Sequence, residues 1–112
     1  MRARRPLPEP VESALRELGT ALAAAYGDRL RGVYLYGSYA RGDFTNASDV
    51  DILITLAGLV NPHHEIGHIS EAVSDICLRH DVLIATYPVP EAWLHERKSP
   101  LFESIRREGI RL

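Results

Sequence analysis

The sequence lacks the features that define several common classes of protein. Cys77 is the only cysteine among 112 residues, so no internal disulfide can form. No apolar run approaches the length that spans a membrane, and no apolar segment of the kind found in signal peptides follows the basic start MRARRPLPEP. These absences lead us to expect a cytoplasmic protein without a membrane partner.

The sequence also has no excess of positive charge. Its 13 Lys and Arg residues are outnumbered by 15 Asp and Glu residues, which gives a formal net charge of -2 at pH 7. Proteins that bind nucleic acid usually carry a basic surface, so direct contact with nucleic acid is not expected. Hydrophobic residues make up 46% of the chain, which is enough for the core of one domain. We expect a single domain over residues 1–112, with a core at about 11–87 and a C-terminal helical segment over 88–112.

What the sequence does contain is an alternation of helical and extended patterns. Apolar residues recur every three or four positions in the helical stretches, and short runs of β-branched and aromatic residues mark the strands. The expected elements are a helix over 11–25, strands over 32–36 and 49–56, a helix that begins at Asn61 and Pro62, a strand over 81–87, a short helical turn near 90–97 and a helix over 99–109. This order is typical of an α/β fold, here a mixed sheet with helices mostly against one face. The pattern leaves open whether the first two strands are antiparallel neighbours or are joined across the sheet.

The connection between the first two strands, YGSYARGDFTNASDVDI, carries the candidate chemistry. Gly37 would let the backbone approach a phosphate, Ser38 can donate its hydroxyl, and Arg41 adds a positive charge. Asp49 and Asp51 alternate along a strand, so their carboxylates face the same way about 7 Å apart. Two such carboxylates repel unless a cation neutralises them, and Mg²⁺ takes one or two carboxylates together with substrate phosphates. The stretch therefore predicts a magnesium–nucleotide site.

Two other residues of this stretch, Tyr39 and Asp43, have a less specific expected role. Tyr39 follows the glycine–serine turn and is a candidate to contact the nucleotide, because an aromatic ring can stack on a base. Asp43 lies among residues typical of a turn and is expected to be solvated. The other tyrosines of the first strand, Tyr34 and Tyr36, are interpreted as packing residues.

These residues resemble a known signature. GSYARGDFTNASDVDILI, with ten residues between Ser38 and Asp49, is similar to the motif of the nucleotidyltransferase fold shared with DNA polymerase β, in its minimal stand-alone form. The resemblance implies that Asp49 and Asp51 hold two Mg²⁺ ions and that Gly37 and Ser38 bind the β- and γ-phosphates of ATP. It also implies a third carboxylate from a later strand, which Asp81 would provide as a catalytic metal ligand.

The resemblance further implies a biological role. Minimal members of this family are often antitoxins paired with a HEPN-type ribonuclease toxin, so the expected activity is transfer of AMP from ATP to a toxin tyrosine within a hetero-oligomer. One alternative is an antitoxin that binds nucleotide without turnover and neutralises its partner by occlusion. Another is adenylylation of a small molecule, although a short chain has little surface for a second substrate pocket.

A competing motif occurs in the second long helix. HEIGH, from His64 to His68, fits the H-E-x-x-H pattern in which two histidines bind zinc and a glutamate serves as the base of a protease. The helical periodicity weighs against this interpretation, because Ile66 and Ile69 are expected to face the core and would turn both histidines toward solvent. A zinc protease is therefore not the favoured prediction.

Overall fold

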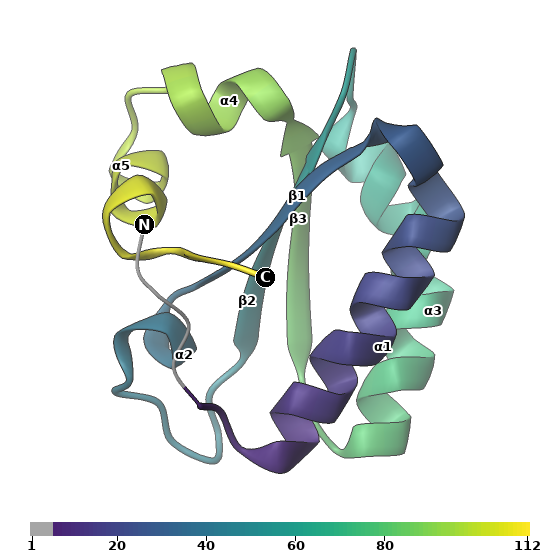
Figure 1. The fold of residues 1–112 in the computed structure, drawn as a ribbon, viewed down its shortest axis with the longest axis vertical. Coiled ribbons are helices and arrows are strands. Elements are labelled where there is room, and N and C mark those ends of the chain that lie inside the picture. The colour runs from purple at the N-terminus through teal and green to yellow at the C-terminus, as the bar shows by residue number, and fades with distance from the viewer. Residues whose placement is uncertain (1–5) are drawn as a thin grey trace.

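The computed structural model describes residues 6–112 and shows a four-stranded mixed sheet with helices on both faces (Figure 1). The basic start of the chain at residues 1–5, which entered the signal-peptide argument, lies outside the described residues. In chain order the elements are α1 (Glu9–Tyr26), η1 (Gly27–Arg29), β1 (Leu30–Tyr36), α2 (Ser38–Arg41), β2 (Val50–Leu56), α3 (Pro62–His80), β3 (Ile84–Pro90), α4 (Glu91–Glu96), α5 (Pro100–Glu108) and β4 (Ile110–Arg111).

The strands lie in the order β3-β2-β1-β4. β1 and β2 are antiparallel neighbours, which settles the point that the sequence left open, and Tyr36 pairs with Asp51. β2 and β3 are parallel, so Asp51 also pairs with Ala85. The two-residue strand β4 adds to the free edge of β1 and was missed, because two residues carry no periodic pattern.

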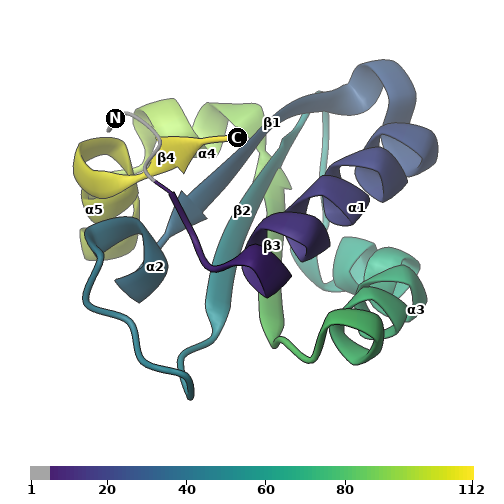
Figure 2. The same cartoon turned by 60° about the horizontal axis from the view of Figure 1, so that its bottom comes forward.

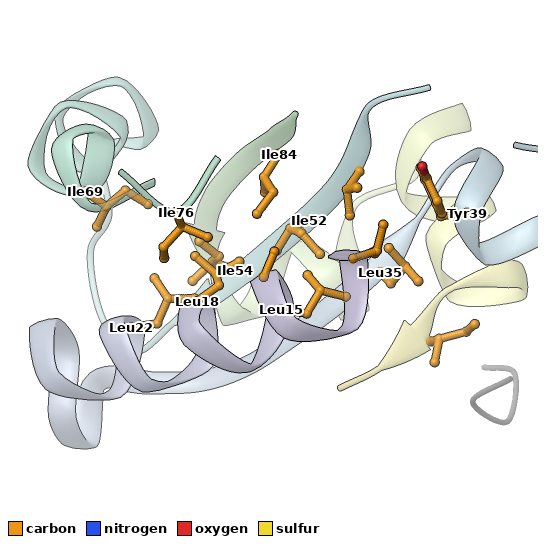
Figure 3. Close-up of a cluster of buried hydrophobic side chains, with 14 of the residues drawn as sticks. Leu15, Leu18, Leu22, Leu35, Tyr39, Ile52, Ile54, Ile69, Ile76 and Ile84 are labelled. Carbon is orange, nitrogen blue, oxygen red and sulfur yellow. The ribbon is translucent and has the colours of Figure 1, made fainter. Parts of the chain in front are cut away.

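One face of the sheet packs against α1 and α3. Figure 3 shows side chains of α1 meeting those of the sheet, with α3 closing the other side of the cluster. The fully buried members of this first core include Leu18, Leu22, Leu35, Ile52, Ile54 and Ile76. Burying such side chains supplies most of the free energy of folding, at roughly 1.5–3 kcal/mol each relative to full exposure.

The opposite face of the sheet packs against α4 and α5, which corrects the expectation that the helices lie mostly against one face (Figure 1). Tyr34, Leu53, Val89, Leu94, Phe102 and Ile105 form this second core. Four of its members come from the predicted helical segment 88–112: Val89 lies on β3, and Leu94, Phe102 and Ile105 lie on the short helices α4 and α5. The C-terminal segment is thus part of the packed fold.

Two local predictions are corrected. The third strand begins at Ile84, three residues after the predicted start, because Asp81 ends α3 in the left-handed conformation with φ 53°. In α3 Ile69 and Ile76 are buried as predicted, but at the start of the helix Ile66 is 39% exposed and Glu65 is buried in its place. The Glu65 carboxylate lies 4.0 Å from the guanidinium of Arg29 in η1. Within residues 6–112 no helix is long and apolar enough to cross a membrane.

The first core makes a direct stability prediction. Ile52→Ala removes a fully buried side chain at the centre of the sheet and is expected to lower the free energy of unfolding by about 2–5 kcal/mol. Leu59→Ala removes a fully exposed side chain and should change it by less than about 0.5 kcal/mol. Urea denaturation followed by circular dichroism measures both values, and equal effects of the two substitutions would contradict the proposed core.

Candidate active site

The turn after β1 brings the backbone close to a carboxylate on the next strand. Gly37 has φ 75°, a conformation that favours glycine, and the short helix α2 follows it directly (Figure 2). The N–H groups of Ala40 and Arg41 donate to the Gly37 carbonyl, each at 3.1 Å. A side chain at residue 37 would run into the Asp51 carboxylate, with its Cβ 3.2 Å from Asp51 Cγ. The glycine is therefore required by both its conformation and its neighbour.

Asp49 and Asp51 lie at the start of β2 on the face that carries the second core. Asp51 is half-buried and Asp49 is exposed. The pKa of Asp51 is raised above its ordinary value of 3.8, first because burial disfavours its charge and then because Asp49 repels it, while Arg41 acts in the opposite direction. The structure therefore brings the two predicted carboxylates into electrostatic contact beside the glycine turn.

Two tyrosines stand beside Asp51. Tyr36 pairs with Asp51 across β1 and β2, and its pKa is raised to about 12 by burial, by the Asp51 charge and by Tyr87. Tyr87 lies on β3 and packs at the margin of the second core together with Tyr36. Sequence reasoning assigned Tyr36 to packing and did not place Tyr87, although both alternate onto the Asp51 face of their strands.

Arg41 forms ion pairs with two acidic residues, Asp43 and Glu108. Its guanidinium lies 3.2 Å from Asp43 and 3.8 Å from Glu108 at the end of α5. Asp43 is exposed, as expected, but it is ion-paired. Glu108 was not predicted, because nothing in the sequence signals that the last turn of α5 meets α2.

Asp81 does not join the two other carboxylates. It is exposed on the connection from α3 to β3, where it lines a cavity of about 380 Å³ together with Val50 and Cys77. Val50 belongs to the first core, on the face of the sheet opposite Asp51. Among residues 6–112 no three His, Cys, Asp or Glu side chains are grouped to hold one metal ion.

The surroundings of Tyr39 favour packing over the expected contact with the nucleotide. Its side chain is 6% exposed and its ring stacks on Phe44, with centroids 4.2 Å apart and planes 12° from parallel. Figure 3 shows Tyr39 at the end of the first core, next to Leu35. One face of the ring is thus covered by the protein's own phenylalanine, which favours a packing role.

The HEIGH motif has no zinc-site geometry in this structure. His64 and His68 are exposed, and the His68 ring makes an edge contact with Tyr26, with centroids 5.8 Å apart. Glu65, the base that a protease would need, is buried on another side of the helix. As noted, the described part of the chain groups no third ligand with these histidines.

Comparison with known families identifies the class of protein to which this fold belongs. A family model of the nucleotidyltransferase domain matches residues 15–106, from α1 to α5. The chain therefore belongs to the nucleotidyltransferase domain family and is classed as a nucleotidyltransferase enzyme. The resemblance seen in the sequence is confirmed.

Two proteins of Methanocaldococcus jannaschii, both named as inferred protein adenylyltransferases, are similar in sequence. MJ0604 is 51% identical over 43 residues, which are 38% of this chain and 43% of that protein. The alignment thus spans less than half of MJ0604. MJ0141 is 29% identical over 96 residues, which are 86% of this chain and 92% of that protein.

Two solved structures share the fold. A chain in a crystal structure of a toxin–antitoxin with AMP-PNP superposes with a TM-score of 0.62 and 19% identity, over 86% of this chain and 69% of that one. A chain in a crystal structure of a mutant of the toxin–antitoxin MntA–HpeT gives a TM-score of 0.60 and 20% identity, over 88% and 70%. At these identities the similarity shows the fold.

The glycine turn makes a testable prediction. Gly37→Ala forces a side chain against the Asp51 carboxylate at a positive φ, so it should lower the free energy of unfolding by more than about 1 kcal/mol and weaken nucleotide binding. Gly67→Ala is the matched control, because a Cβ there meets nothing within 4 Å and should stabilise α3 by about 1 kcal/mol. Chemical denaturation and titration with a fluorescent ATP analogue measure both effects. If Gly37→Ala bound nucleotide like the unaltered protein, the turn would have no part in the site.

Proposed function

We propose that this protein is a magnesium-dependent nucleotidyltransferase that transfers AMP from ATP to a hydroxyl group of a partner protein. The proposal rests on one observation above the others: the turn at Gly37 and Ser38 lies directly against the Asp51 carboxylate. The backbone proposed to bind phosphate and the carboxylate proposed to bind metal are thereby adjacent. A nucleoside triphosphate carrying Mg²⁺ has both of the complementary groups.

The residues present fit one magnesium ion bound with a nucleotide. Burial and then the charge of Asp49 raise the pKa of Asp51, so a divalent cation between the carboxylates would relieve an unfavourable interaction. Carboxylate oxygens are the ligands that Mg²⁺ takes in proteins, with its remaining positions left to water and phosphate. Bound there, the ion would neutralise charge on the triphosphate during transfer.

The chain's own residues would act by position and charge. The N–H groups of Ala40 and Arg41 are bonded to the Gly37 carbonyl, which leaves those of Ser38 and Tyr39, with the Ser38 hydroxyl, as the proposed donors to phosphate oxygens. Arg41, oriented by Glu108, adds a positive charge beside them. In the reaction the acceptor oxygen bonds to the α-phosphorus, the bond to the bridging oxygen breaks, and pyrophosphate leaves with that electron pair while the hydroxyl proton passes to solvent or a base. Such a site accelerates transfer by alignment and electrostatic stabilisation.

A toxin tyrosine is the proposed acceptor. Relatives named as inferred protein adenylyltransferases support a protein acceptor. The fold shared with chains of toxin–antitoxin complexes supports an antitoxin that acts on a toxin within a hetero-oligomer. That the toxin is of the HEPN type is what the resemblance of the sequence motif implies. The described site is also open at the Asp49 end, where that residue is exposed, so a protein side chain could enter.

Mass spectrometry tests this function. The protein is incubated with ATP, Mg²⁺ and the product of the adjacent reading frame, and mass increases of whole AMP units are expected on that partner. Asp49→Asn and Asp51→Asn should abolish the increases, and Asp75→Asn, an exposed carboxylate on α3, should leave them unchanged. An unmodified partner in the presence of folded protein and nucleotide would refute the transfer.

A second candidate function is neutralisation by binding alone. It is favoured by the placement of Asp81 away from the other two carboxylates, because a site with fewer metal ligands is better suited to holding nucleotide than to turning it over. In that case Asp49→Asn and Asp51→Asn would still protect cells from the partner toxin. A growth-rescue assay with these variants separates the two functions.

Asp51 also predicts a dependence of stability on pH. Because the pKa of Asp51 is raised in the folded state, the folded protein binds its proton more tightly than the unfolded chain. The free energy of unfolding should therefore fall as the pH rises through the interval just above 3.8, and the penalty should remain at neutral pH. Asp51→Asn is expected to raise the melting temperature at pH 7 while transfer is lost, and Asp75→Asn should do neither. A lower melting temperature for Asp51→Asn would contradict this assignment.

A further inference from the structure

The strand beside the two carboxylates shows what the site lacks. β3 runs parallel to β2, with Val50 opposite Ile84 and Asp51 opposite Ala85. Continuing this register by one residue sets Leu83 beside Asp49, and the Val50 N–H donates to the Leu83 carbonyl at 2.7 Å. Neighbouring strands lie about 4.8 Å apart, so residues 83 and 85 are the positions from which β3 could reach a metal shared with Asp49 and Asp51.

The side chains at these positions face the carboxylates. Val82 and Ile84 both pack against the first core, on the α1 and α3 side of the sheet. Because side chains alternate along an extended chain, Leu83 and Ala85 lie on the Asp51 side. Leu83 is 65% exposed, so it is a large apolar side chain held at the surface next to an acid. Neither residue can ligate a metal.

Asp81 does not compensate for this. The left-handed conformation at Asp81 ends α3 two residues before Leu83 and turns the chain, so Asp81 lies outside the ladder with β2. There it lines a cavity with Val50 and Cys77, and the exposed Leu83 also touches the edge of that cavity. The residues that the structure describes thus supply two carboxylates to the site and no third, in agreement with the lack of any three-ligand cluster among them.

We infer that this chain holds a single metal ion, the one that travels with the nucleotide, and that Leu83 occupies the position where a carboxylate would be needed to hold a second. The inference rests on the proposed function and refines it. The chain aligns and neutralises the triphosphate through its own residues, but it offers no metal ligand on the acceptor side. The acceptor hydroxyl must then lose its proton to a base carried by the partner protein or to solvent.

Counting bound metal ions tests the inference directly. The protein is first saturated with α,β-methylene-ATP, in which the bond that transfer would break is blocked. Mn²⁺ is then titrated in as the probe. Electron paramagnetic resonance measures the bound and the free Mn²⁺ ions. The unaltered protein should bind one ion, and Asp81→Asn should still bind one. Leu83→Asp should bind two, because it supplies the missing ligand beside Asp49. Leu78→Asp is the matched control, since Leu78 is 82% exposed on α3, and it should bind one.

The outcomes distinguish failure of this inference from failure of the proposed function. Two ions in the unaltered protein, one of them lost in Asp81→Asn, would overturn the inference and leave the function standing. An unchanged count of one in both Leu83→Asp and Ala85→Asp, each shown to be folded by circular dichroism, would also overturn the assignment of the missing position. No bound ion above that held by free nucleotide would instead refute the proposed magnesium–nucleotide site.

Discussion

The close approach of the Gly37 backbone to the Asp51 carboxylate is the constraint on which the candidate site depends. It joins the end of β1 to the start of β2, and it requires a residue without a side chain at a positive φ. The antiparallel pairing of Tyr36 with Asp51 holds the two elements in this relation. Because the pairing is anchored by fully buried side chains further along both strands, such as Leu35 and Ile52, the packing of the core fixes the geometry of the site.

The position of Asp51 that the proposed function needs also lowers the stability of the folded protein. Asp51 is half-buried beside Asp49, and both its burial and this neighbour disfavour its charge. A fold selected for stability alone would place a neutral residue there. Under the proposed function, the same unfavourable charge would favour binding of a cation that arrives with a nucleotide. Arg41, held by Glu108, offsets part of the repulsion and ties α2 to α5.

The site lies at one end of the sheet, on the face that carries the second core. The first core, between the sheet and α1 and α3, holds the strands together, and the second core, under α4 and α5, covers only part of the other face (Figure 1). Asp49, which is exposed, and Asp51, which is half-buried, lie on that face beside Tyr36 and Tyr87.

The sequence by itself determined the order of the main elements, the glycine turn, and the shared face of Asp49 and Asp51, because each of these is local: helix and strand periods and the alternation of side chains need no distant contact. The tertiary structure alone decided which distant residues meet. The left-handed end of α3 removed Asp81 from the third strand, and the parallel register of β2 and β3 set Leu83 beside Asp49. Packing of α5 brought Glu108 to Arg41. Such contacts depend on how whole elements dock, which no short window of sequence records.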